Sequence, residues 1–368
     1  MLGVALALAA LASCATVNPD FNAGKPHHRP DGFNNRFIDN WSADQPSFWR
    51  WQRERLTSDL PTQNAARVPR VGLDPQALRR PPPGEASVTW IGHSTMLWQV
   101  GGLNILTDPQ FSRRASPVQW AGPEREVPLP VQLDELPRID VVLVSHNHYD
   151  HLDLATVQAL AAQPGGSPLF VVPLGLDRWL QDVGVSRTRR LDWWDSLELA
   201  APAGRAQLHL VPAQHWSGRT LWDRNATLWG GFVLEVWPAG PSQPAAAGAE
   251  GPPLRLYYSG DTGYSADFAE IGERFGPFDF AQIPVGCYLP RWFMRRQHVN
   301  EEEALRIHRD VKSRFSVGVH WGTFRLCDDP VDAPLDGLPA ARHALGVGDD
   351  EFVLMAIGET RTLRRPAP

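Results

Sequence analysis

The chain has few lysines, few cysteines and no excess of positive charge. Lys25 and Lys312 are the only lysines among 35 basic residues, and we attribute this bias toward arginine to the codon usage of a GC-rich genome. The formal net charge of −6 argues against a polyanion-binding surface, and therefore against a nucleic-acid partner. The three cysteines, Cys14, Cys287 and Cys327, show neither C-x-x-C spacing nor a framework pattern. A Cys287–Cys327 disulfide stays open, but two buried thiols are the expectation.

The apolar run over residues 1–13 is too short to span a bilayer as a helix. It is typical of the core of a secretory signal, and its end, Leu11-Ala12-Ser13-Cys14, resembles the bacterial lipobox, in which cleavage precedes a lipidated cysteine. We therefore expect a signal peptide over 1–13 and a lipid anchor on Cys14. This places the protein on the periplasmic side of a bacterial membrane, the outer membrane included. No lysine or arginine precedes the run, so a start upstream of Met1 and an apolar helix of a cytoplasmic protein stay open.

Residues 14–86 are predicted to form an irregular arm. The run Pro81-Pro82-Pro83-Gly84 is typical of a linker, because proline and glycine interrupt regular structure. The pair His27-His28 could bind a metal ion, but a solvated surface pair is the expectation. Three aromatic residues are expected to pin the arm onto the main domain: Phe48, Trp49 and Trp51. The chain of 368 residues, with 43% hydrophobic content, is long enough for one large domain or two ordinary ones.

The densest group of potential metal ligands lies between Ser145 and Asp153. It holds three imidazoles and a carboxylate in the pattern H-x-H-x-D-H, at His146, His148, Asp150 and His151. The apolar, β-branched run over 139–144 predicts a buried strand before it, and the spacing over 154–162 predicts a helix after it. The group therefore lies on a loop at the carboxyl end of a strand, where open α/β sheets place their sites. Neutral imidazole and carboxylate are ligands that suit zinc.

Other predicted strands also end in potential ligands. Apolar runs over 208–211, 254–258 and 316–319 are followed by His215, Asp261 and His320. Runs over 88–91 and 103–106 lead to His93 and Asp108, near the same edge of the sheet. For Asp108 two interpretations stay open: it orients a ligand imidazole, or it caps the turn before a proline.

Together these residues predict two metal sites with a shared ligand. Side chains two apart in an extended loop point the same way, so His146 and His148 can reach one ion. The first site would comprise His146, His148 and His215, and the second Asp150, His151 and His320, with Asp261 as the bridge. This arrangement, with a water between the ions, is typical of binuclear hydrolases.

Short stretches between residues 90 and 324 follow one another in the order of a known family. They are residues 90–95, 106–109, 114–117, 145–153, 172–175, 191–194, 214–216, 260–264, 274–279, 290–294, 297–299 and 320–324. This succession is similar to the metallo-β-lactamase superfamily. Within that superfamily it resembles the N-acylphosphatidylethanolamine-hydrolysing phospholipase D group.

The resemblance implies an α/β fold, a four-layer αββα sandwich over residues 87–365. It implies two Zn²⁺ per chain with a bridging hydroxide, and a phosphodiesterase that releases N-acylethanolamine and phosphatidic acid from the lipid. The alternatives are a lactonase or another soluble-substrate hydrolase of the same superfamily, and an inactive metal-binding protein of the envelope. The complete ligand set argues against the last of these.

Candidate substrate-binding residues lie on two later segments. Charge that develops on the phosphate would be met by Arg219 or Gln297. The segment 288–296 mixes large apolar and cationic side chains, so Tyr288 and Trp292 are expected to contact acyl chains. An ordinary buried loop with its arginines reaching solvent is the alternative for this segment.

Two residues of the predicted centre are assigned to the chemistry itself. Asp150 is a candidate catalytic residue as well as a ligand. His298 would either protonate the leaving group or orient a ligand. The group that the chain resembles carries a basic pair after the His-Trp, whereas this chain has Ser217-Gly218-Arg219, which lacks one positive contact to a phosphate. The expected partner is a phospholipid or another small ester, and the oligomeric state stays open.

Overall fold

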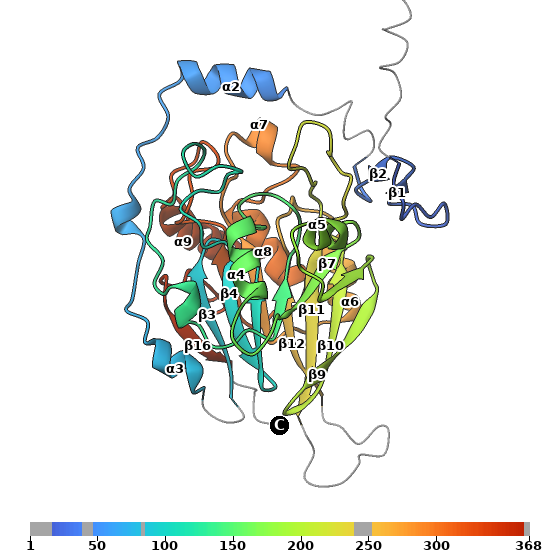
Figure 1. Cartoon of the computed structure of the whole chain (residues 1–368). Helices are drawn as coiled ribbons and strands as arrows, with labels where there is room; N and C mark the ends of the chain where they lie inside the picture. The colour runs from blue at the N-terminus through green and yellow to red at the C-terminus, as the bar shows by residue number, and fades with distance from the viewer. Residues whose placement is uncertain (1–16, 39–46, 82–84, 239–251, 364–368) are drawn as a thin grey trace, which may run out of the picture.

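The computed structural model describes residues 17–38, 47–81, 85–238 and 252–363. The predicted signal peptide and Cys14 lie outside the described residues. Within them, two seven-stranded sheets lie face to face and helices cover both outer faces (Figure 1). The predicted αββα sandwich is confirmed.

The first sheet combines the first strands of the domain with the last one. Its order is β16-β3-β4-β5-β6-β7-β8. The bounds are Thr360–Leu363 for β16, Ala86–Gly92 for β3, Thr95–Val100 for β4, Leu103–Thr107 for β5, Val141–Leu143 for β6, Leu169–Pro173 for β7 and Thr188–Leu191 for β8. The strands from β16 to β5 pair antiparallel, and those from β5 to β8 pair parallel.

The second sheet repeats this plan with the order β15-β14-β13-β12-β11-β10-β9. The bounds are Phe352–Val353 for β15, Ser316–Val319 for β14, Phe280–Pro284 for β13, Leu254–Tyr258 for β12, Gly231–Pro238 for β11, Gly204–Val211 for β10 and Ser196–Ala201 for β9. The strands from β9 to β12 pair antiparallel and those from β12 to β15 pair parallel. In both sheets the parallel strands aim their carboxyl ends at one edge, where their following loops meet.

Helices form the outer layers. On the first sheet lie α4 (Leu154–Ala161) and α5 (Leu176–Asp182), and on the second lie α6 (Asp267–Arg274), α8 (Glu301–Asp310) and α9 (Pro334–Leu345). Short α7 (Arg291–Met294) and the 3-10 turn η2 (Leu133–Glu135) lie in connections. The helix predicted over 154–162 is confirmed as α4, whose N-cap Asp153 accepts a hydrogen bond from the amide of Thr156 at 3.1 Å.

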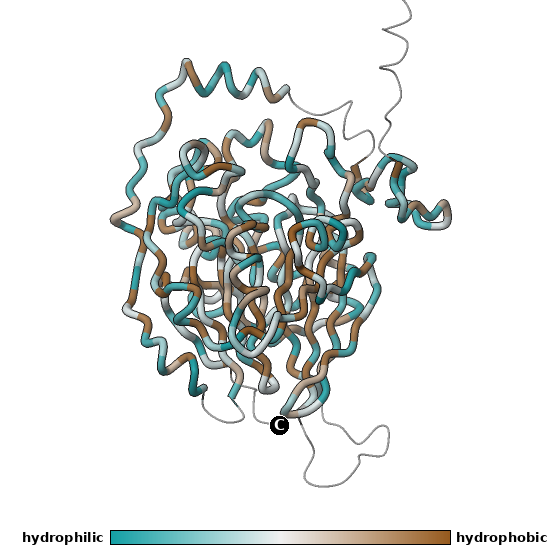
Figure 2. Tube along the Cα trace, viewed as in Figure 1, coloured by the Kyte–Doolittle hydropathy of each residue, from teal (hydrophilic) through white to brown (hydrophobic). Residues whose placement is uncertain are grey.

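The hydrophobic core has two parts, because successive side chains of a strand point to opposite faces of the sheet. In β6, Val141 and Leu143 point into the layer between the sheets, whereas Val142 packs under the helices of the first face. Trp98 of the first sheet meets Phe280 of the second with ring centroids 6.0 Å apart, which joins the two sheets. Hydrophobic residues accordingly concentrate inside the body in Figure 2.

The N-terminal arm is more ordered than predicted. It contains the hairpin of β1 (His28–Arg29) and β2 (Gly32–Phe33), helix α2 (Phe48–Thr57), the turn η1 (Ala65–Arg67) and helix α3 (Pro75–Arg79). It passes over α7 and down one side of the body (Figure 1). Trp51 pins α2 as predicted, because it stacks on Phe293 at 4.9 Å and its Nε1 donates to Asp328 Oδ2 at 2.8 Å. Phe48 and Trp49 do not pin the helix, because 51% of the surface of Phe48 and 79% of that of Trp49 stay exposed.

The prediction of a solvated pair at His27 and His28 was wrong. Both are buried, and their Nε2 atoms lie 2.7 and 2.9 Å from the two oxygens of Asp192, which follows β8. Lys25 Nζ reaches the same carboxylate at 2.5 Å. One buried acidic group therefore attaches the arm to the first sheet.

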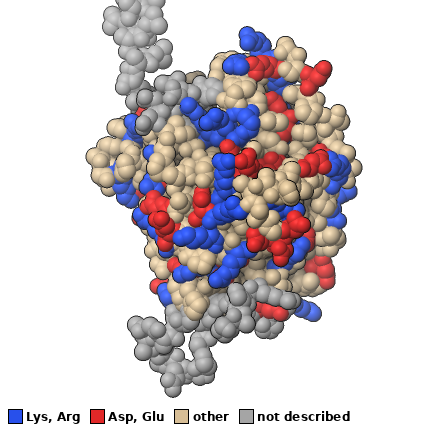
Figure 3. All heavy atoms as spheres, turned by 180° about the vertical axis from the view of Figure 1, so that it is seen from behind, with Lys and Arg blue, Asp and Glu red and all other residues tan. Residues whose placement is uncertain are grey.

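The surface carries both signs of charge. On the face in Figure 3, acidic and basic side chains interleave, which agrees with the small net charge. Among the described residues, no helix is long and apolar enough to cross a bilayer.

Candidate metal centre

The predicted ligands converge at the sheet edge where the parallel strands end. His146, His148, Asp150 and His151 lie on the β6–α4 loop. The others come from the connections after β10, β12 and β14: His215, Asp261 and His320. Five of the seven are almost completely buried, and His148 and Asp150 are partly buried. The tertiary structure thus brings together every residue predicted as a ligand.

Three imidazole nitrogens form the first cluster. His148 Nδ1 lies 2.8 Å from His146 Nε2 and 3.4 Å from His215 Nε2. Burial lowers the pKa of His148 and that of His215 to about 3, although the nearby carboxylates oppose this shift, so these rings are neutral at pH 7. His215 Nδ1 lies 3.0 Å from the carbonyl oxygen of Gln297 and donates to it, which directs the lone pair of Nε2 into the cluster.

The second cluster pairs two imidazoles with two carboxylates. His151 Nε2 lies 3.2 Å from Asp150 Oδ2 and 3.1 Å from Asp261 Oδ2. His320 Nε2 lies 3.3 and 3.0 Å from the same two oxygens. Burial opposes protonation of His320, but Asp261 and Asp150 raise its pKa to about 9. Burial likewise opposes ionisation of both carboxyls, but His151 beside them holds the pKa of each well below its usual value.

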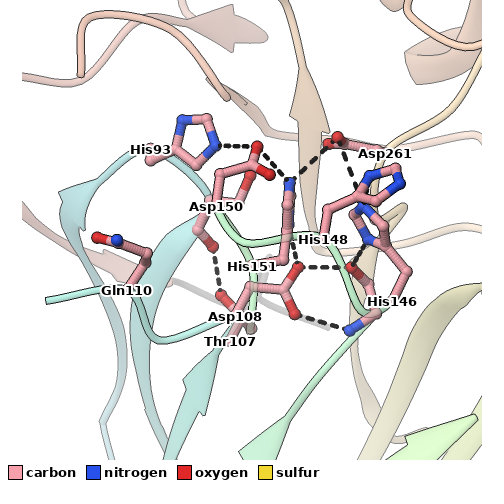
Figure 4. Close-up of polar contacts among 12 residues, drawn as sticks. His93, Thr107, Asp108, Gln110, His146, His148, Asp150, His151 and Asp261 are labelled. Carbon is pink, nitrogen blue, oxygen red and sulfur yellow. Dashed lines mark hydrogen bonds and ion pairs between the residues drawn. The ribbon is translucent and has the colours of Figure 1, made fainter. Parts of the chain in front are cut away.

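Asp261 connects the clusters. Its Oδ2, besides the contacts to His151 and His320, lies 3.9 Å from both His146 Nε2 and His215 Nε2. Figure 4 shows its carboxylate facing His151 and the histidines of the H-x-H pair. One oxygen is therefore placed to contact cations in both clusters.

The site fits divalent cations. In the first cluster, lone pairs of neutral rings face one another in a buried space, an arrangement that is unfavourable without a cation. In the second cluster, two carboxylates keep His151 and His320 protonated. A divalent ion can supply the same positive charge in place of these protons. Among the described residues, Asp261 Oδ1 is buried without a hydrogen-bond partner. Both clusters therefore have the donor set of a metal centre.

Asp108 holds the loop that carries most of these ligands. Its Oδ1 accepts from the amide of Ser145 at 2.7 Å, and its Oδ2 lies 2.6 Å from His151 Nδ1 (Figure 4). The hydroxyl of Tyr258 donates to the same carboxylate. Of the two interpretations left open, the structure thus favours the orientation of an imidazole. Sequence reasoning missed Tyr258, because nothing in its strand pattern marks a buried hydroxyl.

His93 supports the second cluster from the β3–β4 turn. Its Nε2 lies 2.9 Å from Asp150 Oδ2, and its ring centroid lies 4.2 Å from that of His320. The residue is buried and adopts a positive φ of 53°. His93 therefore fixes a carboxylate of the centre from outside.

A cavity of about 290 Å³ opens onto both clusters. Gln297 and His298 line it, as expected for residues that face the substrate. His298 Nδ1 lies 4.0 Å from Asp261 Oδ2, and burial holds the pKa of this imidazole well below its usual value. Whether His298 donates a proton or orients a ligand stays a prediction.

The structure does not bring three predicted substrate residues to the cavity wall. Tyr288 donates its hydroxyl to Glu301 Oε1 at 2.9 Å, and the ring of Trp292 supports the guanidinium of Arg50 at 4.2 Å. Arg219 Nη1 donates to the carbonyl oxygens of Asn147 and Leu152 at 2.7 and 2.8 Å. Arg219 thus braces the ligand loop from behind. Its contacts could not be read from its position after the His-Trp pair.

The expectation of two buried thiols was also wrong. Cys287 and Cys327 form a disulfide, and both line the cavity. They follow β13 and β14, which are neighbouring parallel strands, so their loops meet despite a separation of 40 residues.

Comparison with known proteins agrees with this geometry. Residues 103–321 match the family described as the Beta-lactamase superfamily domain. The chain belongs to the metallo-β-lactamase superfamily. Its relatives include metal-dependent hydrolases, which agrees with the two clusters of potential ligands.

Two relatives of the family carry the same enzyme name. The N-acyl-phosphatidylethanolamine-hydrolyzing phospholipase D 1 of Caenorhabditis elegans is 38% identical over 282 residues, or 74% of each chain. The mitochondrial N-acyl-phosphatidylethanolamine-hydrolyzing phospholipase D of Saccharomyces cerevisiae is 39% identical over 240 residues, or 65% of this chain and 48% of that protein. The chain thus spans about half of the yeast relative. A metallo hydrolase of the archaeon Ignicoccus hospitalis is 21% identical with a TM-score of 0.54, covers 77% of this chain and 100% of its own, and supports the fold alone.

Proposed function

We propose that the protein is a binuclear, zinc-dependent phosphodiesterase of the phospholipase D type. It hydrolyses N-acylphosphatidylethanolamine-like lipids to N-acylethanolamine and phosphatidic acid. The position of Asp261 Oδ2, 3.0–3.1 Å from one cluster and 3.9 Å from the other, carries the binuclear part of the proposal. The names of the two relatives support the lipid substrate.

Zinc is the metal that the donor set favours. The first cluster offers three imidazoles and the second offers two imidazoles and two carboxylates, with neither thiolate nor an all-oxygen shell. Bound zinc supplies a Lewis acid and lowers the pKa of a water ligand toward 7. The chain's own contribution is the fixed geometry: Asp108 and His93 hold the ligand side chains from outside.

The cavity wall suits a lipid with an anionic headgroup. Its apolar side chains come from α2, α7 and the loop after β14: Phe48, Trp51, Phe293, Met294 and Leu326. They can contact an acyl chain and exclude water from the reacting phosphate. Gln297 lines the same space, and its side-chain amide nitrogen lies 3.4 Å from the sulfur of Met294. It can therefore donate a hydrogen bond to a phosphate oxygen.

The reaction is the attack of water on phosphorus. The water oxygen bonds to phosphorus and the bond from phosphorus to the ethanolamide oxygen breaks. The proton that the water loses ends on the leaving alkoxide. The new oxygen therefore belongs to phosphatidic acid, which separates this route from attack at a carbonyl.

Isotope labelling tests this route. Hydrolysis of N-acylphosphatidylethanolamine by the zinc-loaded protein in ¹⁸O-water should place one label on phosphatidic acid and none on the ethanolamide, as read by mass spectrometry. Protein stripped by a chelator should be inactive and should recover with zinc. Rapid hydrolysis of lactones with no cleavage of the phosphodiester would instead identify the enzyme as a lactonase.

We propose further that Cys14 is lipidated and that the mature protein lies on the periplasmic side of a membrane. The lipobox-like end of the apolar run supports this, and so does the Cys287–Cys327 disulfide, because disulfides persist in oxidising compartments. Intact-mass measurement of protein from native membranes should find residues 1–13 absent and acyl groups on Cys14. A mature chain that still begins at Met1 would contradict export by this route.

A further inference from the structure

One cation on the cavity wall has no acidic partner. Arg224 lies on the β10–β11 loop and lines the cavity together with His148, Asp150 and Asp261. Its guanidinium lies over the ring of Trp216, with Cζ 4.3 Å from the centroid. In the part of the chain that the structure describes, no carboxylate forms an ion pair with it. Arg219, five residues earlier, differs because carbonyl oxygens of the ligand loop already satisfy its guanidinium.

Arg224 brings a positive charge to the cavity wall. Burial lowers the pKa of Arg224 to about 10, and no acidic neighbour offsets this effect. The side chain is nevertheless charged at pH 7. The residue as a whole is exposed, so a ligand can reach the guanidinium, which gains most from an anion that accepts two hydrogen bonds.

Hydrogen bonds fix the loop that carries Arg224 at the residues before and after it. The carboxylate of Asp223 accepts from the amides of Arg219 and Thr220 at 3.0 and 2.7 Å. The amide of Asn225 donates to the carbonyl oxygen of Ser217 at 2.8 Å, and Asn225 adopts a positive φ of 57°. The backbone at Arg224 is thus positioned before any ligand binds.

Trp216 connects this cation to the metal centre. Its ring contacts both the guanidinium of Arg224 and the imidazole of His148, whose centroid is 4.1 Å from that of Trp216. The cation therefore lies one ring away from the first cluster, on the wall that a bound headgroup would face.

We propose that Arg224 is the residue that recognises the anionic phosphodiester, and that it sets the preference for charged phosphodiesters over neutral esters. This rests on the proposed function. A non-bridging phosphate oxygen binds the guanidinium while the phosphorus faces the clusters. Arg224 supplies the positive contact that Ser217-Gly218-Arg219 lacks, because the guanidinium of Arg219 is directed into the ligand loop.

The first test is direct binding of inorganic phosphate to the zinc-loaded protein, measured by titration calorimetry. Arg224→Gln should raise the dissociation constant about 10-fold or more, since hydrogen bonds to charged groups contribute about 1.5–3 kcal/mol. Arg224→Lys should recover part of the loss. The matched control is Arg53→Gln, which removes an exposed arginine of α2 that does not line the cavity. Equal affinity in Arg224→Gln and Arg53→Gln, or no binding by the unaltered protein, would overturn the proposal.

The second test separates recognition from chemistry. For N-acylphosphatidylethanolamine, Arg224→Gln should raise KM about 10- to 100-fold and change kcat by less than about 3-fold. Kinetics with an uncharged ester should be unchanged. If the unaltered protein cleaves only neutral esters, the proposed function fails, while phosphate binding still decides the role of Arg224. A fall in kcat with unchanged KM would contradict a recognition role.

Discussion

Asp261→Ala should lower kcat/KM for the phosphodiester by at least about 10³-fold and remove most of the bound metal. Asp261 Oδ2 is the atom placed to contact cations in both clusters, so its loss affects both. A metal supplies several kcal/mol of transition-state stabilisation, and about 4 kcal/mol corresponds to 10³-fold in rate. Elemental analysis after reconstitution with zinc, together with steady-state kinetics, measures both quantities. The unaltered protein should hold two ions per chain.

His93→Ala is the matched control for Asp261→Ala. His93 contacts Asp150 Oδ2 at 2.9 Å and faces only the second cluster, whereas Asp261 faces both. Loss of such an orienting partner commonly costs about 10- to 100-fold in affinity or activity. His93→Ala should therefore keep more metal and more activity than Asp261→Ala. Equal metal content in the two variants, or a single ion in the unaltered protein, would contradict the bridging role of Asp261.

Asp192→Ala should lower the free energy of unfolding by about 2–3 kcal/mol, because it leaves buried donors without their acceptor. The carboxylate of Asp192 contacts His27, His28 and Lys25 of the arm at 2.5–2.9 Å. Its oxygen Oδ1 also accepts from the amide of Trp193 at 2.8 Å. Urea unfolding measures the loss of stability. Limited proteolysis should show new cleavage within residues 17–38, because the hairpin of β1 and β2 loses its attachment.

The control for this effect is Asp59→Ala. Asp59 also lies in the arm, but it is exposed, and none of the described cations pairs with it. Its replacement should change the free energy of unfolding by less than about 0.5 kcal/mol and leave the cleavage pattern unaltered. If Asp192→Ala and Asp59→Ala unfold at the same urea concentration, the buried carboxylate does not hold the arm.

The strands and the ligand loop could be predicted because their signals are local. Alternate residues of β6 pack in different layers, so the apolar run at 139–144 predicted a strand buried on both faces. The H-x-H-x-D-H pattern predicted a cluster of metal ligands, because its four potential ligands lie within six residues after that strand. The sequence also predicted three further ligands, His215, Asp261 and His320, because the ends of parallel strands meet at one edge of a sheet.

The substrate residues could not be predicted in the same way. Arg219 and Arg224 carry the same charge on one loop, yet only Arg224 faces the cavity. The turn between them decides this, and contacts of Asp223 and Asn225 hold the turn. Tyr288 and Trp292 have the expected apolar character, but their partners, Glu301 and Arg50, lie in other elements.

The resemblance to a known family implied the fold class, and the sequence by itself determined several of the buried strands and the set of potential ligands. These depend on spacing and on periodicity, which neighbouring residues define. Only the tertiary structure decided that Cys287 pairs with Cys327, that Asp192 buries the histidines of the arm, and which arginine reaches the cavity. Each of these depends on loops that meet across large separations in the chain. The free energy of such a contact is set by the burial and the partners at the meeting point, which the pattern of either segment alone does not contain.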